Sequence, residues 1–245
     1  MGNEHPKQPT RGRAVRLDRS EPDIASQEQV LPLISEWIKG DDFSCLAAKA
    51  AVRRGLLGHA VLGPLGAPGT TEALHAHLER FVTESLDPQE NFATFVAVFD
   101  GPTGLMEEEF EGALWGQLQE LHDYDAQRYG WAAGADDDPE SPHFAFSVAE
   151  HPFFVVGLHD AASRITRRFP LPAVAFNSHH QFDRLKRSGV YAGLQRRIRE
   201  REMRLQHSVN PNLSEFGDIS EARQYSGRSA EAEWKCPFRP LALKR

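Results

Sequence analysis

The stretch Phe153-Phe154-Val155-Val156-Gly157-Leu158-His159 runs through aromatic and branched apolar residues and ends in a histidine. An apolar run of this length, rich in β-branched and aromatic side chains and bounded by turn residues, is typical of a buried strand. We therefore expect a strand that ends near Leu158 and holds the His159 imidazole in a fixed position.

Similar short runs lie on either side of this strand in the sequence. Residues 143–148 precede it, residues 173–177 follow it, and residues 91–99 form another apolar run farther upstream. The run at 143–148 is close enough to residues 153–158 for a hairpin. Together these segments predict one mostly antiparallel sheet.

Helices account for most of the remaining chain. They are predicted over residues 27–39, 44–54, 70–86, 107–125 and 190–206,. From about residue 208 to residue 240 the sequence is rich in Asn, Pro, Gly and Ser, which predicts an irregular C-terminal tail wrapped on the domain. The expected fold class is α+β, with a single domain over residues 25–245 and a disordered N-terminal leader over residues 1–24.

The composition is that of a water-soluble globular protein. Hydrophobic residues make up 40% of the chain and charged residues 26%, and no apolar run approaches the roughly 18 residues that span a bilayer. We therefore expect no membrane partner. Cys45 and Cys236 are the only cysteines and form no CxxC pair, so neither a disulfide framework nor a structural zinc site is expected. The expected location is the cytoplasm.

The net charge of −7 conceals an uneven distribution. Residues 100–140 are acidic, with Arg128 as the single base, whereas residues 160–206 are strongly basic. Solvated helix faces are the common explanation for such blocks. The functional alternative is a basic block that holds an anionic partner, such as a phosphate, a nucleic acid or cofactor carboxylates.

The sequence has no Walker A, GxSxG or HExxH motif and no GxGxxG after a strand,. Two arginines, however, follow His159 closely. Arg164 and Arg168 are four residues apart and would share one face of a helix, where they could bind two carboxylates. A neutral imidazole beside such a pair is what a haem site requires. From this segment alone, a buried structural histidine beside a basic surface helix is the commoner explanation.

A second cluster, His179-His180, follows the strand at residues 173–177. Neighbouring helix residues point about 100° apart, so only one of the two imidazoles can readily face a given site, and we choose His179. Cys236 could supply a thiolate ligand, although a lone buried thiol is the commoner explanation.

Five motifs follow one another in the second half of the chain. They are FFVVGLH (153–159), ASRITRRF (162–169), AFNSHHQFDRLK (175–186), NPNLSEFGDISEARQYSGR (210–228) and WKCPF (234–238). In this order they resemble the YqcI/YcgG family, with weaker similarity upstream at Phe43-Ser44-Cys45 and at residues 114–125. The resemblance covers about residues 43–238. It implies a haem-dependent oxygenase, with haem b as cofactor, that N-hydroxylates the guanidine group of an arginine-like substrate.

The resemblance also implies roles for individual residues. His159 matches the GLH histidine and is the expected iron ligand, with His179 and Cys236 as alternatives. His179 and Tyr225 are the expected catalytic residues. The positions expected to bind the cofactor are His159, Arg164, Arg168, Arg228 and Cys236. The chain departs from the family pattern at Ser44, usually proline, at Asp160, often proline, at Ala149-Glu150, usually glycines, and at His207, usually glycine.

The implied reaction sets the expected partners. A guanidinium substrate needs a planar carboxylate, and charge alone points to Asp123, Asp125 or Glu150. Dioxygen with two electrons, or peroxide, would be the oxidant, and a separate reductase would supply the electrons because nothing here resembles a flavin or iron–sulfur module. The expected oligomeric states include a homodimer.

Two rival functions remain at this point. The first is a haem-binding sensor or another haem protein without hydroxylase activity. The second is a protein without haem that binds nucleic acid through the basic helix at residues 191–206. We do not expect nucleic acid as a partner, because Glu200 and Glu202 weaken the field of that helix and stacking aromatic residues are not interleaved with its arginines.

Overall fold

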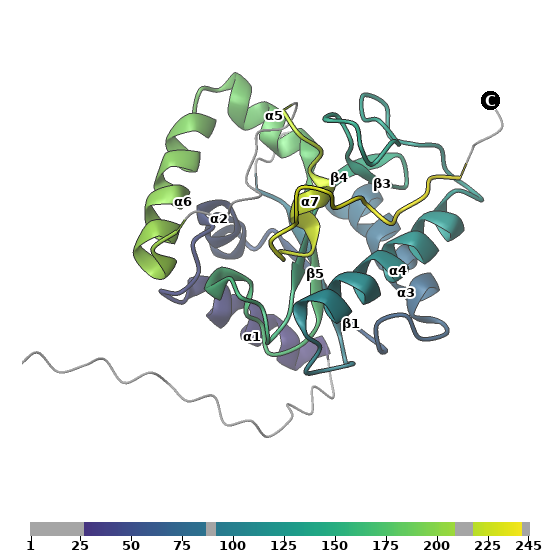
Figure 1. Cartoon of the computed structure of the whole chain (residues 1–245), viewed down its shortest axis with the longest axis horizontal. Helices are drawn as coiled ribbons and strands as arrows, with labels where there is room; N and C mark the ends of the chain where they lie inside the picture. Colours follow the sequence, from purple (N-terminus) through teal and green to yellow (C-terminus); the bar gives the residue numbers. More distant parts are fainter. Residues whose placement is uncertain (1–26, 87–91, 209–217, 242–245) are drawn as a thin grey trace, which may run out of the picture.

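The computed structural model describes residues 27–86, 92–208 and 218–241, and a five-stranded sheet in the order β1-β2-β5-β4-β3 lies at its centre (Figure 1). The strands are β1 (Leu57–Leu62), β2 (Thr94–Phe99), β3 (Phe146–Val148), β4 (His151–Leu158) and β5 (Ala173–Ser178). β1 and β2 are parallel, and the other neighbouring pairs are antiparallel. The α+β class and the mostly antiparallel sheet are therefore confirmed.

Helices surround this sheet. The α-helices are α1 (Gln27–Lys39), α2 (Leu46–Arg54), α3 (Thr70–Arg80), α4 (Glu107–Asp125), α5 (His179–Arg187), α6 (Tyr191–Gln206) and α7 (Ala222–Tyr225). A π-helical turn, Phe81–Ser85, continues α3, and a 3₁₀ turn covers Ile165–Arg167. α1, α4 and α6 match their predicted ranges closely. The helix predicted over residues 44–54 begins at Leu46 in the structure, with Cys45 as its N-cap.

β1 is the strand that the sequence analysis did not predict. It pairs with β2 from Leu57–Thr94 to Leu62–Phe99 and lies at the edge of the sheet. Most of its residues are only partly buried, and Gly58 and His59 interrupt its apolar pattern. Pairing with β2, rather than its own composition, therefore accounts for this strand.

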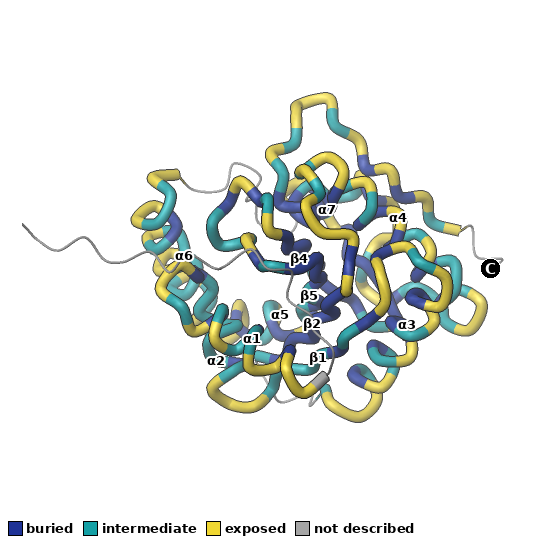
Figure 2. The backbone as a smooth tube through the Cα atoms, turned by 90° about the horizontal axis from the view of Figure 1, so that it is seen from below, coloured by how far each residue is buried: buried dark blue, intermediate teal, exposed yellow. Residues whose placement is uncertain are grey.

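The two faces of the sheet bury different side chains, because successive residues of a strand point to opposite sides. One face, which we call the aromatic face, presents Phe95, Phe153 and Phe176 to α3, α4 and the C-terminal tail. The other, which we call the aliphatic face, presents Val96 and Val98 to α1 and α2. In Figure 2 the strands are mostly dark blue, whereas α6 is mostly teal and yellow.

The tail over residues 218–241 contains the short helix α7 and is otherwise irregular, as predicted. Cys236 and Phe238 from this tail are buried in the core of the aromatic face. The expected leader, residues 1–24, lies outside the described residues. In the part of the chain that the structure describes, no helix is both long and apolar enough to cross a membrane.

Non-glycine residues with left-handed backbone mark two turns within the described ranges. Ala149 (φ 50°) and Glu150 (φ 58°) connect β3 to β4, and His207 (φ 54°) ends α6. Left-handed positions of this kind favour glycine in tight hairpins and at helix C-termini. Glycines, which the resemblance implies at these positions, would therefore adopt this backbone with less strain.

Candidate functional site

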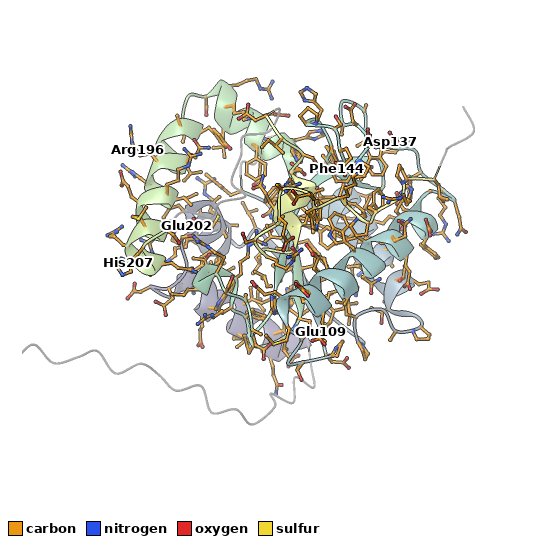
Figure 3. The ribbon with its side chains drawn as sticks, viewed as in Figure 1. Glu109, Asp137, Phe144, Arg196, Glu202 and His207 are labelled. Carbon is orange, nitrogen blue, oxygen red and sulfur yellow. The ribbon has the colours of Figure 1, made fainter. Side chains whose placement is uncertain are left out.

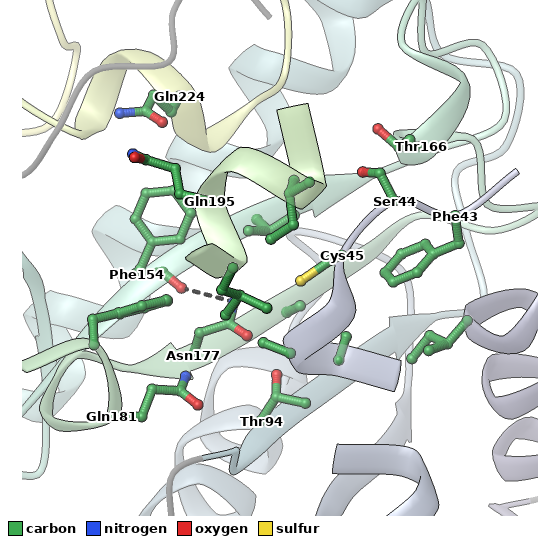
Figure 4. Close-up of a pocket in the computed structure, with 18 of the residues that line it drawn as sticks. Phe43, Ser44, Cys45, Thr94, Phe154, Thr166, Asn177, Gln181, Gln195 and Gln224 are labelled. Atoms are coloured by element: carbon green, nitrogen blue, oxygen red, sulfur yellow. Dashed lines mark hydrogen bonds between the residues drawn. The ribbon is translucent and has the colours of Figure 1, made fainter. Parts of the chain in front are cut away.

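A cavity of about 300 Å³ lies between the aliphatic face of the sheet and helices α2, α5 and α6 (Figure 4). Adjacent strands contribute Val96, Val156 and Ala175 to its lining, and small or apolar side chains make up much of the rest. A concave, largely apolar space of this size with a few polar groups is typical of a small-molecule or cofactor site. The polar and charged side chains that reach it are Ser44, Cys45, Thr94, Arg164, Thr166, Arg167, Asn177, His179, Gln181, Asp183, Lys186, Gln195, Arg199, Glu202, Glu221 and Gln224.

The apolar face of α6 forms one wall of this cavity. Tyr191, Leu194 and Ile198 line it, and none of the three belongs to the buried core clusters. The helix thus uses its predicted apolar side to enclose the cavity. Figure 3 shows Arg196 pointing away from the body of the protein and Glu202 pointing toward it.

Cys45 brings a sulfur atom to the cavity at the N-terminus of α2. In Figure 4 the sulfur points away from α2 into the space between the lining residues. Burial raises the pKa of the Cys45 thiol, and the nearby backbone N–H groups of Ala48 and Ala47 partly oppose that shift. The helix N-terminus therefore directs partial positive charge at this sulfur.

Arg164 is the buried cation of the cavity wall. Its guanidinium donates to Glu202 Oε2 at 3.1 Å and to the hydroxyl of Ser208 at 3.0 Å. Its Nε is buried and has no hydrogen-bond acceptor among the described residues. A buried donor without an acceptor costs free energy, so an anionic ligand in the cavity would be stabilised here.

The predicted pairing of Arg164 with Arg168 on one helix face was wrong. Only Ile165–Arg167 forms a helical turn, and both arginines flank it in extended backbone. Arg168 Nε donates to the carbonyl of Ala162, and Arg168 does not line the cavity. The arginine that joins Arg164 in the lining is Arg167, which is held by the carbonyls of Gly157, Gln224 and Tyr225.

His179 is the first residue of α5 and lines the cavity, whereas its neighbour His180 is exposed and does not. The choice of His179 over His180 agrees with this placement. His179 Nε2 lies 2.8 Å from Glu221 Oε2, and the hydroxyl of Tyr225 donates to Glu221 Oε1 at 2.5 Å. Glu221 therefore links the two predicted catalytic residues.

His159 lies on the other side of the sheet. Its ring stacks on Phe110 of α4 with centroids 4.3 Å apart, and it is not among the residues that line the cavity. Burial lowers the pKa of His159, and Glu107 and Asp160 partly oppose this effect. Its Nδ1 has no hydrogen-bond partner among the described residues, but a phenyl ring occupies the face of the imidazole.

Two further predicted cofactor residues also lie away from the cavity. Arg228 pairs with Glu111 at 2.9 Å and with Glu231 at 2.7 Å. Cys236 is buried in the core of the aromatic face, where burial raises its pKa to about 12. The structure therefore brings Arg164, His179 and, through Glu221, Tyr225 to one site, but not His159, Arg168, Arg228 or Cys236.

The carboxylates chosen from charge alone also lie outside the cavity lining. Asp125 accepts hydrogen bonds from the His75 ring and from the backbone of Ala149, at 2.8 and 2.9 Å. Asp123 accepts one from Gln119, and Glu150 lies in the β3–β4 turn. The carboxylates that do line the cavity are Asp183, Glu202 and Glu221.

Cys45 and Glu221 are the residues that the sequence analysis missed as members of a site. The signal for Cys45 was the upstream similarity at Phe43-Ser44-Cys45, directly before a predicted helix. Glu221 carried a weaker signal, because it lies 42 residues after His179 in an irregular segment. Only the fold brings the two into contact.

The comparison with known proteins gives one match. No curated protein and no solved structure shows significant similarity to this chain. The sequence profile of the YqcI/YcgG family, in contrast, matches residues 34–239. This match spans both faces of the sheet and the segments that line the cavity, so the chain belongs to the YqcI/YcgG family.

Proposed function

We propose that this chain is a haem-dependent monooxygenase that N-hydroxylates a guanidine-containing amino acid or amine, with haem b bound in the cavity. The family resemblance implies this activity, and the composition of the cavity supports it. When bound, haem supplies the oxidising chemistry that transfers one oxygen atom of dioxygen or peroxide to the substrate. A cytoplasmic location, which keeps both free cysteines reduced, is part of the proposal,.

The chemistry of the cavity lining supports a haem group as the ligand. The apolar strand residues and the α6 wall suit a flat hydrophobic macrocycle, and Arg164 offers a buried Nε to a propionate carboxylate,. Arg199 and Lys186 add further cations to the lining. The site therefore combines an apolar body with cationic groups for two carboxylates, as haem requires.

Cys45 is the observation that carries the proposal. A sulfur that lies at a helix N-terminus and lines a largely apolar cavity has the features of a thiolate ligand to haem iron,. We therefore assign the iron ligand to Cys45 rather than to His159, whose ring is covered by Phe110. The guanidinium partner is assigned to the lining carboxylates Asp183, Glu202 and Glu221 as a group.

Haem titration of the purified protein tests the cofactor. We expect a Soret band on adding haem, and a ferrous carbon monoxide complex with the strongly red-shifted band of thiolate-ligated haem. Cys45→Ser should abolish that shift, while the matched variant Cys236→Ser should retain it. A shift that survives in Cys45→Ser but disappears in Cys236→Ser would overturn the assignment of Cys45, as would an imidazole-type spectrum that His159→Ala removes. Absence of a Soret band would overturn the haem proposal itself.

Turnover tests the substrate class. Haem-loaded protein with a reductase and dioxygen, or with peroxide, should convert arginine or agmatine to a product heavier by one oxygen atom, detected by mass spectrometry. Haem binding without turnover of any guanidine would instead favour a haem protein that does not hydroxylate.

A further inference from the structure

A row of buried hydrogen bonds leads from the cavity into the core of the aromatic face. His179 lies in the cavity lining, Glu221 accepts from or donates to its Nε2 at 2.8 Å, and Tyr225 donates to the second carboxylate oxygen of Glu221 at 2.5 Å. Glu221 is 3% exposed and Tyr225 is fully buried. Bulk water therefore has little access to the carboxylate.

The electrostatic environment of these three side chains favours the transfer of a proton between His179 and Glu221. Burial raises the pKa of Glu221, while the hydrogen bonds from His179 and Tyr225 lower it. Burial and the neighbouring Glu221 hold the pKa of Tyr225 well above its usual range, so Tyr225 keeps its proton. The 2.8 Å contact between His179 Nε2 and Glu221 Oε2 lets either residue hold a proton placed between them, and the pair has the same net charge in both arrangements. Moving this proton creates no net buried charge, which would be costly.

The proposed reaction, on which this inference rests, consumes protons. The substrate N–H, dioxygen, two electrons and two protons give the N-hydroxylated product and one water. With hydrogen peroxide as oxidant, a proton must instead pass from one peroxide oxygen to the other, which leaves as water when the O–O bond breaks. Both routes require an acid–base group beside the reacting oxygen.

We propose that His179 is this proton-transferring residue and that Glu221 is the positioning residue that orients its imidazole and exchanges the proton with it. His179 is the imidazole of the cavity lining, because His180 is exposed and His159 lies across the sheet. Tyr225 fixes the carboxylate of Glu221 from the side of the core.

Two reactions of the haem-loaded protein distinguish a role in proton transfer from a distortion of the cavity. Reaction with hydrogen peroxide moves a proton, whereas binding of carbon monoxide to the reduced haem moves none. Both are followed by the change in the Soret band after rapid mixing, and neither requires the substrate to be known. The variants are Glu221→Gln and His179→Gln, with Glu231→Gln as a matched control at an exposed carboxylate.

We expect Glu221→Gln and His179→Gln to slow the peroxide reaction by about 100-fold, a typical contribution of acid–base catalysis, and to leave carbon monoxide binding and haem affinity unchanged. Glu231→Gln should match the wild type in all three measurements. Equal slowing of both ligands in Glu221→Gln would show a structural role and overturn the inference, as would an unchanged peroxide rate. Failure of the wild-type protein to bind haem would overturn the proposed function as well, so the two failures are distinguishable.

Discussion

Gly157 of β4 packs directly against side chains of α4. A Cβ at this position would lie 2.7 Å from Phe110 Cε1 and 3.0 Å from the carbonyl oxygen of Tyr225. The second contact is with backbone, which cannot rotate away. We expect Gly157→Ala to lower the free energy of unfolding by about 1–3 kcal/mol, as other overpacked cores do, measured by urea denaturation.

The control for this prediction is Gly116→Ala on the exposed side of α4. A Cβ there meets nothing within 4 Å, so the better helix propensity of alanine should stabilise the protein by up to about 1 kcal/mol. Equal stability of the Gly157→Ala protein and the wild type would contradict the packing described for β4 and α4.

His151 should make the stability of the protein sensitive to mild acid. Burial, helped by the nearby His180, His179 and Arg184, lowers the pKa of His151 from 6.5 to about 3, and its Nε2 lies 2.8 Å from Ser178 Oγ. Above pH 6.5 the residue is neutral in both folded and unfolded chains and adds no pH dependence. Below pH 6.5 the unfolded chain gains a proton that the folded chain gains only near pH 3, so the stability falls as the pH falls through this window.

The measurement compares wild type with His151→Gln in urea at pH 7 and pH 5.5. We expect the wild type to lose roughly 1 kcal/mol more than the variant over this interval, since one pKa unit corresponds to about 1.4 kcal/mol. Parallel losses in both proteins would show that other groups cause the acid sensitivity.

The sequence predicted single residues best where a local rule decides their direction. Helix geometry indicated that only one of His179 and His180 could face a site, the family resemblance pointed to His179, and the structure places only His179 at the cavity. Cys45 and Glu221 could not be found in this way, because their significance depends on a cavity formed by segments far apart in the chain.

At the scale of elements, the backbone at the C-terminal end of α6 is strained, and a substitution can test this strain. His207 is its C-cap in left-handed backbone, and its N–H donates to the carbonyl of Met203. A residue with a Cβ pays about 1 kcal/mol or more in this conformation, which glycine avoids. We expect His207→Gly to stabilise the protein by up to about 1 kcal/mol in thermal unfolding.

Ser188→Gly provides the comparison at the end of α5. Ser188 has right-handed backbone (φ −78°) and donates through its hydroxyl to the carbonyl of Leu185. Glycine there should be neutral or destabilising. A gain in stability at Ser188 equal to that at His207 would show that the left-handed backbone is not the cause.

Elements with a strong periodic pattern were predicted well, as α1, α4 and β4 show. The errors arose where tertiary contacts decide the structure. β1 forms because β2 offers it a parallel edge. The segment after His159 consists of turns around the single 3₁₀ turn Ile165–Arg167, with Arg167 and Arg168 held by backbone carbonyls. The spacing of Arg164 and Arg168 therefore suggested a helix that does not form.

At the scale of the whole molecule, the sheet separates the core of the aromatic face from that of the aliphatic face. Gly157 belongs to the first, and Ile34 of α1 is buried in the second. We expect Gly157→Ala and Ile34→Val to change the free energy of unfolding additively, within about 0.5 kcal/mol, because the sites share no partner.

Two substitutions on the same face should behave differently. Leu114 Cδ2 lies 3.1 Å from the position of a Cβ at residue 157, so Leu114→Ala would relieve part of the overpacking. The double variant Gly157→Ala with Leu114→Ala should be more stable than the sum of the single effects by about 0.5 kcal/mol or more. Strict additivity of Gly157→Ala and Leu114→Ala would contradict the division of the core into two faces. Strong coupling between Gly157→Ala and Ile34→Val, across the sheet, would contradict it as well.

This separation of the two faces bears on how the sequence can change over generations. Substitutions among the aromatic residues alter chiefly how much folded protein a cell contains, whereas substitutions among the residues of α2, α5 and α6 alter chiefly the shape and charge of the cavity. A lineage could therefore exchange one ligand for another without rebuilding its core. Glu221 is the exception, because it touches both His179 and Tyr225, and selection on either face constrains it.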